Sequence, residues 1–143
     1  MSNTKRKGRK GILSRIFGTG NYETRTIYFK STAIKVFIAD SFTKKMFGLM
    51  HWERLGAREG MLFPLNSAAE AGIWMLGMKF SIDIIWLDAK GKVIDMVAGA
   101  KPCNIFTCKV YYPVGKPSYV LEIGAGVSRK LGLKPGAKVN LGK

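Results

Sequence analysis

The chain has 143 residues, 47% of them hydrophobic, which suffices for one globular domain with a real core and excludes a disordered or low-complexity protein. Its 24 Lys and Arg stand against 9 Asp and Glu, and the resulting net charge of +15 exceeds what a domain needs to stay dispersed. Because so many positive charges repel one another in a compact chain, we predict that the protein binds a polyanion. The alternative is a basic protein that has no polyanionic partner.

Residues 1–21 are predicted to form a basic, flexible arm ahead of a single domain of residues 22–143. Cations packed this densely repel one another and bury no core, so we expect an extended arm that gains order by neutralising phosphates. Residues 1–30 carry eight Lys and Arg and one Glu, a net +7, and the remainder carries +8, so the body is basic too. The cations of the arm are Lys5, Arg6, Lys7, Arg9, Lys10 and Arg15.

No apolar run reaches the ~20 residues that a bilayer-spanning helix needs. The apolar stretch of residues 11–18 is short and contains Arg15, which makes it a poor signal-peptide core. We therefore predict a cytoplasmic protein. Attachment of the arm to an anionic membrane surface through residues 12–17 is a weaker alternative.

The segment that follows the arm predicts strands and one helix. Asp40 and Ser41 are a helix N-cap signal, because either side chain can accept an orphan amide hydrogen. The apolar stripe after them has helical spacing, and Gly48 is expected inside that helix at a cost of about 1 kcal/mol. In chain order, the predicted elements are a strand pair at 26–39, a helix at 42–50, a buried strand at 60–64 and a loop at 66–72.

Residues 73–88 form the longest apolar segment, and their spacing predicts the central strand. Alternate residues from Met78 to Trp86 are apolar, which is the period of a strand, whose side chains point to opposite sides in turn. The first half of this strand should have one polar face, and the second half should be buried on both faces. The polar face would carry Lys79, Ser81 and Asp83.

The remainder of the chain predicts a hairpin, a long connection and a second helix. The turn at 88–91 contains Gly91, so the chain should return beside the central strand. The second helix should stop at Gly132. The predicted elements are a strand at 92–97, an irregular connection at 101–117, a strand at 118–123, a helix at 127–131, a type II turn at 134–137 and a strand at 137–141.

Several motifs of this chain resemble the family called "domain of unknown function 192". In order, they are Gly48-Leu-Met50, Gly60-Met-Leu-Phe63, Trp74-Met75, the run 78–88, Cys103 with Cys108, Tyr119-Val-Leu-Glu122 and Gly132-Leu-Lys-Pro-Gly136. The resemblance covers about 100 residues. It implies a compact, β-rich α+β domain, which we expect to have a mixed or barrel-like sheet and two short helices.

The same resemblance implies little about activity, because the family has no settled biochemical role. Many bacterial members resemble exported proteins with a signal sequence. This chain departs from them by having a basic arm in that place. The departure favours an intracellular and archaeal setting.

The two cysteines, Cys103 and Cys108, are separated by four residues. A structural zinc site usually has four nitrogen or sulfur ligands, and His51 is the sole histidine, so we predict no metal and no cofactor. Free thiols are the first expectation. A disulfide is the alternative, most of all in a hyperthermophile.

No pattern of catalytic residues is found. Lys79 and Asp83 lie four residues apart on a strand, so their backbones should be about 13 Å apart, too far for an acid–base pair. Asp83 is expected to accept backbone amide hydrogens and fix a loop, with a ligand site at Lys79, Ser81 and Asp83 as the alternative. The amides of residues 124–126 could face a phosphate, although a plain strand-to-helix turn is the simpler interpretation.

The sequence therefore predicts a basic RNA-binding protein, associated with ribosomal RNA and neighbouring ribosomal proteins or with another ribonucleoprotein. Its contacts would go to phosphates and would not read sequence. A small-molecule or glycan-binding domain, or an uncharacterised enzyme, at the Lys79–Asp83 face is the alternative. The predicted RNA contacts in the body are Lys44, Lys45, Arg129, Lys130 and Lys134, and Tyr22, Tyr28, Tyr111 and Tyr112 could stack on exposed bases.

Overall fold

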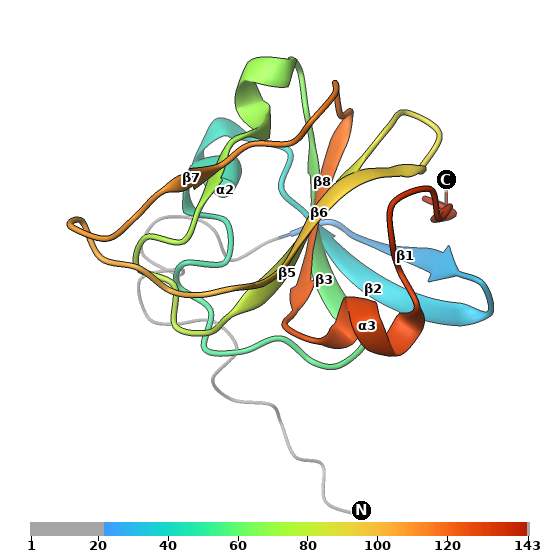
Figure 1. The fold of residues 1–143 in the computed structure, drawn as a ribbon. Coiled ribbons are helices and arrows are strands. Elements are labelled where there is room, and N and C mark those ends of the chain that lie inside the picture. Colours follow the sequence, from blue (N-terminus) through green and yellow to red (C-terminus); the bar gives the residue numbers. More distant parts are fainter. Residues whose placement is uncertain (1–21, 143) are drawn as a thin grey trace, which may run out of the picture.

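A computed structural model describes residues 22–142 as a six-stranded sheet, a separate two-stranded sheet and short helices (Figure 1). The strand order is β1-β2-β3-β8-β5-β6; β2 and β3 are parallel and the other neighbours are antiparallel. The predicted α+β class with a mixed sheet is confirmed. The elements are β1 (Thr24–Phe29), β2 (Thr32–Ile38), α2 (Phe42–Phe47), β3 (Glu59–Pro64), the 3-10 helix η1 (Ala68–Ala71), β4 (Ile73–Trp74), β5 (Ile82–Leu87), β6 (Val93–Ala100), β7 (Val110–Tyr111), β8 (Tyr119–Gly124) and α3 (Val127–Leu131).

The C-terminal segment joins the two edges of the sheet, which makes the sheet barrel-like. Val139 donates its amide hydrogen to the carbonyl of Gly91, next to β6, at 2.8 Å. Asn140 and Tyr28 of β1 exchange backbone hydrogen bonds of 2.8 and 2.9 Å. We call residues 28–30, 88–92 and 137–142 together the seam, which lies on the right of Figure 1. The predicted last strand is thus a pair of isolated bridges.

Gly91 allows the seam to close. Its φ is +88°, a conformation that side chains other than glycine rarely adopt. A Cβ atom at this position would lie 2.1 Å from the carbonyl oxygen of Val139. The absence of a side chain therefore lets the C-terminal segment approach the turn between β5 and β6.

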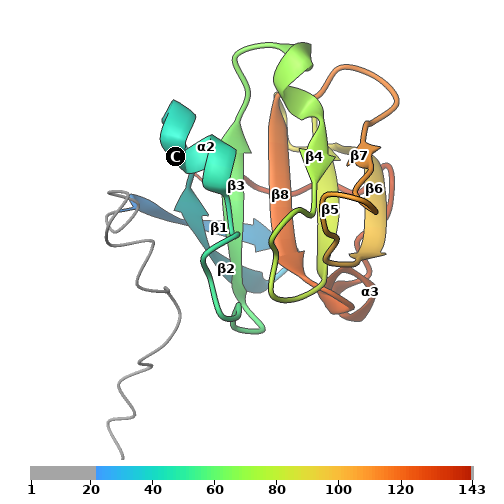
Figure 2. The ribbon, with the colours of Figure 1, turned by 90° about the vertical axis from the view of Figure 1, so that its left-hand side faces the viewer.

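Two apolar clusters lie on opposite faces of the sheet, because successive strand residues point to opposite sides. Leu121 and Ile123 of β8 belong to the cluster enclosed by the barrel, and Val120 belongs to the other. On the face toward the viewer in Figure 2, α2, η1, β4 and β7 cover the second cluster. All six residues of β5 are buried, which confirms the prediction that the second half of the central strand is buried on both faces.

The predicted start of the central strand is wrong. β4 ends at Trp74, and the chain reaches β5 through an irregular segment. Gly77 has a φ of +68°, and Met78 donates its amide hydrogen to the carbonyl of Met75 in a turn, so the backbone is not extended there. The alternation of apolar and polar residues before Ile82 reflects a winding loop that passes over the sheet.

The first helix is also shorter than predicted. Ser41 caps α2 as expected, since its hydroxyl accepts the amide hydrogen of Lys44 at 3.2 Å. The helix ends at Phe47, and Gly48 lies at its C-cap with a φ of +47° rather than inside it. Near its start, Phe42 is 78% exposed, so the apolar stripe is not a buried face. The second helix and its stop at Gly132 match the prediction.

Candidate functional site

The predicted ligand site at Lys79, Ser81 and Asp83 does not exist as a shared face. Lys79 lies on the surface and forms an ion pair with Glu53. Asp83 is fully buried in β5. Ser81 is half-buried, and its carbonyl accepts the amide hydrogen of Ala125 at 3.3 Å. The three residues belong to a loop and to the first turn of a strand, and they do not converge on a cavity.

Asp83 instead ties three segments of backbone together, as predicted from its apolar flanks. Its carboxylate accepts amide hydrogens from Gly99 at 2.8 Å, Gly126 at 3.1 Å and Ser128 at 3.0 Å. The hydroxyl of Ser128 donates a fourth hydrogen bond at 2.6 Å. The amides at the start of α3 are therefore occupied by a carboxylate of the chain itself, so they do not form a phosphate site.

The predicted RNA contacts in the body fall into two groups. Lys44 and Lys45 form ion pairs with Asp40 at 3.3 Å and Glu70 at 3.0 Å, so nearby carboxylates already neutralise them. The second group lies on and just after α3, is exposed, and has no carboxylate within ion-pair distance among residues 22–142. It consists of Arg129, Lys130 and Lys134. The predicted contacts of the arm, Lys5, Arg6, Lys7, Arg9, Lys10 and Arg15, lie outside the described residues.

The structure brings together a group of lysines that the sequence did not indicate. A cavity of about 530 Å³ opens along the seam, lined by Lys30, Lys90, Lys138 and Tyr28. All four side chains are exposed, and within the part of the chain that the structure describes none of the three lysines forms an ion pair. We call this cavity the seam groove. Its lysines come from three distant segments, which explains why no local pattern predicts it.

Asp88 is the acidic residue within the seam. Its carboxylate accepts the amide hydrogens of Lys92 and Lys90 at 2.9 Å each, and these hydrogen bonds hold its pKa below the ordinary value. Lys92 and Lys138 lower the same pKa further through their charge. Asp88 is thus engaged with its own turn, and the lysine head groups around the groove remain available to an anion.

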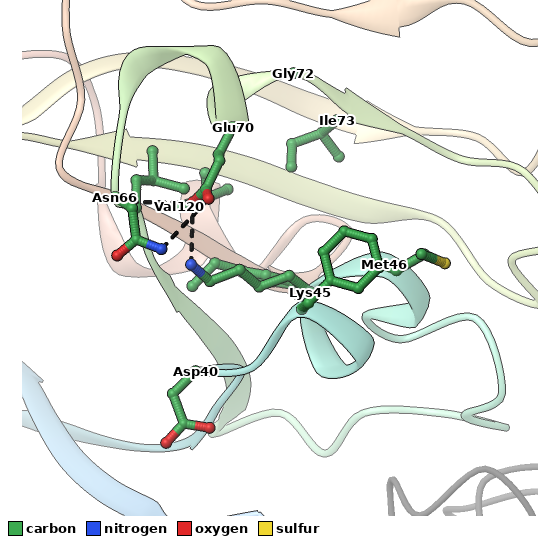
Figure 3. A pocket seen from close by; sticks show the side chains of 11 residues that line it. Asp40, Lys45, Met46, Asn66, Glu70, Gly72, Ile73 and Val120 are labelled. Carbon is green, nitrogen blue, oxygen red and sulfur yellow. Dashed lines mark hydrogen bonds and ion pairs between the residues drawn. The ribbon is translucent and has the colours of Figure 1, made fainter.

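A second cavity, of about 470 Å³, lies between α2, the end of β3 and the segment of η1; we call it the outer pocket. In Figure 3 the side chains of Lys45 and Asn66 point toward the carboxylate of Glu70 at its rim. The backbone amide of Asn66 donates a hydrogen bond to that carboxylate at 3.0 Å. This bond is the main reason that the pKa of Glu70 is lowered, and the hydrogen bond from Lys45 contributes. The rim is therefore a neutralised polar cluster above an apolar floor.

A smaller cavity of about 220 Å³ adjoins the outer pocket and shares five of its lining residues; we call it the inner pocket. It is lined mostly by apolar side chains, with Lys45 at its edge with the outer pocket and one acid, Glu122 of β8, which is only 5% exposed. Within residues 22–142 no group donates a hydrogen bond to this carboxyl or forms an ion pair with it. Four methionines line the inner pocket: Met46, Met50, Met75 and Met78.

Burial of Glu122 should make stability depend on pH. Desolvation raises its pKa from 4.5 to about 8, so the unfolded chain releases this proton at lower pH than the folded chain. Below pH 4.5 the protonated Glu122 makes its full contribution to the free energy of unfolding. This contribution is lost as the pH rises toward 8, by about 1.4 kcal/mol per pH unit. We expect Glu122→Gln to remove this loss, as measured by urea unfolding at pH 5 and pH 7.5.

The control for this measurement is Glu70→Gln. The pKa of Glu70 is lowered, so its contribution is constant between pH 5 and 7.5. The stability of Glu70→Gln should therefore run parallel to that of the wild type. If Glu122→Gln also ran parallel to the wild type, Glu122 would be ionised in the folded chain and the account of the inner pocket would be wrong.

Cys103 and Cys108 form a disulfide, with Cα atoms 5.0 Å apart, rather than the free thiols that were the first expectation. The bridge closes a short loop whose tip carries two highly exposed apolar side chains, Ile105 and Phe106. No group of three or more His, Cys, Asp or Glu that could hold a metal ion occurs in residues 22–142. Over the same residues, no helix is long and apolar enough to cross a membrane.

Comparison with known proteins identifies relatives of this chain. The profile of the family described as DUF192, Uncharacterized ACR, matches residues 25–141. A UPF0127 protein of Thermococcus kodakarensis is 31% identical over 102 residues, which are 71% of this chain and 61% of that protein. A UPF0127 protein of Pyrococcus horikoshii is 34% identical over 107 residues, 73% of this chain and 85% of that protein. The chain thus matches about three-fifths of the length of the Thermococcus relative.

Solved structures share the fold. A protein of unknown function from Novosphingobium aromaticivorans is 28% identical, with a TM-score of 0.72 over 85% of this chain and 87% of that chain. A structure from Sinorhizobium meliloti is 20% identical, with a TM-score of 0.71 over 84% of this chain and 95% of that chain. These likenesses place the barrel-like sheet and its two short helices in a known fold.

Proposed function

This chain belongs to the DUF192 family, whose description assigns no activity, and we propose from the charge of its surface that it is a cytoplasmic RNA-binding protein. Its partners would be ribosomal RNA with neighbouring ribosomal proteins, or another stable ribonucleoprotein. The observation that carries this proposal is the seam groove, where Lys30, Lys90 and Lys138 surround a cavity without forming ion pairs among the described residues.

The proposed contacts are electrostatic. Three lysine head groups that are not neutralised favour a phosphate backbone, because each contact releases condensed counterions. Tyr28, at the same groove, is 42% exposed and can stack on an unpaired base. Lys134 and Lys138 belong to the segment that leads from α3 into the seam, so the cations of α3 extend the basic surface. The basic arm would add further phosphate contacts.

The groove can be tested with a charge-matched pair of variants. We expect Lys30→Ala/Lys90→Ala/Lys138→Ala to bind a structured RNA roughly tenfold more weakly or worse at about 0.15 M salt, because phosphate contacts are lost. The control, Arg54→Ala/Lys101→Ala/Lys109→Ala, removes the same charge from exposed sites that do not line the seam groove. Filter binding of the full chain measures both.

The outcomes separate local contacts from net charge. A loss confined to the seam variant supports the groove. An equal loss in both variants would mean that only the overall charge matters, and no loss in either would contradict RNA binding at the seam. Vesicles of anionic lipid serve as a second probe; binding to them without binding to RNA would overturn the proposal in favour of a membrane surface.

A further inference from the structure

The inner pocket contains a buried acid that the proposed RNA interface does not use. Glu122 lies on the same face of β8 as Val120, and its register partners in the neighbouring strands are Met61 and Ile84. The strand residues around it on this face, Met61, Phe63, Ile84, Trp86 and Val120, are apolar members of the second cluster. A carboxyl here costs desolvation free energy that an apolar side chain of similar volume would avoid.

Buried polar groups in folded proteins almost always have a hydrogen-bond partner. No group among residues 22–142 donates a hydrogen bond to the carboxyl of Glu122, whereas Asp83, which is fully buried, accepts hydrogen bonds from three amides and a hydroxyl. Glu122 therefore does not hold segments of backbone together as Asp83 does. A perturbed acid that lines a cavity and lacks a partner is typical of a binding site.

The inner pocket is also where the motifs of the family resemblance meet. Gly48 to Met50, Phe63, Trp74 with Met75, and Glu122 belong to four separate motifs, and all of them line this cavity. These residues lie just after α2, in β3, at the end of β4 and in β8, so the fold assembles them around one space. This convergence indicates a site rather than an accidental gap.

We propose that the inner pocket binds a small organic cation, an amine or guanidinium group on an apolar body, with Glu122 as its counter-charge. A cationic head group would supply the positive partner that the carboxyl lacks. Phe47 and Trp74, which line the cavity, can attract a cation through their ring faces. Methionine side chains are flexible and polarizable, and they adapt to apolar ligands of different shape.

The other charges near the pocket agree with this choice. Lys45 also lines the inner pocket, but its ammonium is held by Glu70 at 3.0 Å on the rim. With Glu122 ionised, these three side chains carry a net negative charge, which disfavours an anion. A glycan would bring hydroxyl groups into a cavity with few polar partners, at a cost in unmade hydrogen bonds.

The cavities also fit the size of such a ligand. The inner pocket, of about 220 Å³, has room for the head group, and the adjoining outer pocket, of about 470 Å³, has room for the apolar body. Together they are within the range of small-molecule sites. The ligand would enter past the exposed side chains of Phe42 and Met46.

Benzylamine, benzyl alcohol and benzoate, which have the same ring and different charge, test the proposal on the full chain. Binding is followed by NMR of methionine methyl groups, four of which line the inner pocket. We expect benzylamine to bind at least tenfold more tightly than the alcohol at pH 8.5, and benzoate not to bind. The preference should decrease at pH 6, because the cation must then displace the proton of Glu122, while Lys45 and Glu70 keep their charges.

Glu122→Gln should lose the preference for benzylamine and still bind the alcohol, and Glu53→Gln, which removes an exposed acid that lines neither pocket, should keep the preference. Calorimetry in two buffers of different ionisation enthalpy needs no variant and should detect release of a proton when benzylamine binds at pH 7. Alcohol or benzoate binding as tightly as the amine would overturn the proposal. So would a preference that survives in Glu122→Gln, binding without proton release, or methionine signals that respond to none of the three compounds.

Discussion

Replacing Asp83 by alanine should lower the free energy of unfolding by about 4 kcal/mol, because the buried Ser128 and the part-buried amides of Gly99 and Gly126 lose the acceptor that they share. The carboxylate is fully buried and accepts hydrogen bonds from the amides of Gly99, Gly126 and Ser128. These donors lie in β6 and at the start of α3, so one side chain holds the helix to the sheet. Urea unfolding measures the loss, and thermal unfolding should show a midpoint lower by roughly 10 °C.

Asp40→Ala is the matched control for this prediction. Asp40 is an exposed aspartate paired with Lys44 at 3.3 Å, and exposed ion pairs contribute at most about 1 kcal/mol. Asp83→Asn should fall between the two, because one of its side-chain oxygens still accepts while its NH₂ group faces donors. If Asp83→Ala were as stable as Asp40→Ala, the buried hydrogen bonds would not be what anchors α3.

Deletion of residues 1–21 should have the largest effect on RNA binding. The deletion removes six Lys and Arg and no Asp or Glu, which lowers the net charge from +15 to +9. Affinity for structured RNA at low salt should decrease roughly 100-fold, because each lost phosphate contact also loses its counterion release. Filter binding with the full chain and the shortened chain measures this difference.

An arm with the same residues in shuffled order is the appropriate control. It keeps charge and length, so it should bind RNA about as tightly as the wild type if the arm contacts phosphates without reading sequence. A variant with the six cations of the arm replaced by glutamine should behave like the deletion. Full affinity in the glutamine variant would show that the arm is dispensable, which contradicts the account.

Local patterns predicted those parts of the fold that depend on neighbouring residues. The cap of α2 at Ser41, the turn that contains Gly91 and the stop of α3 at Gly132 all follow from one or two side chains or a glycine. The burial of β5 on both faces followed from its unbroken apolar run. In each of these cases the physical cause lies within a few residues of its effect.

Local patterns did not predict the features that form where segments distant in the sequence meet. The alternation before Ile82 suggested a strand, but Gly77 turns the chain and sends Met75 into the core. The groove lysines Lys30, Lys90 and Lys138 meet only because the C-terminal segment closes the barrel. Their proximity depends on strand order, which a single sequence does not contain.

Glu122 left a signal that could have been found. It follows Val120 at a spacing of two in a strand with apolar neighbours, so it had to point toward one of the two apolar faces. A lone acid does not form a pattern of paired carboxylates, so the spacing of acids along the chain gives no indication of it. An ionisable side chain in an apolar strand is therefore worth noting before any partner is known.

The salt dependence of RNA binding tests the central proposal most directly. The affinity of the full chain for a structured RNA should be measured between about 0.05 and 0.4 M monovalent salt and plotted as the logarithm of the association constant against the logarithm of salt concentration. Contacts from the seam groove and the arm predict a slope of about −5 or steeper. A slope shallower than about −2, or no binding at the lowest salt, would contradict the account.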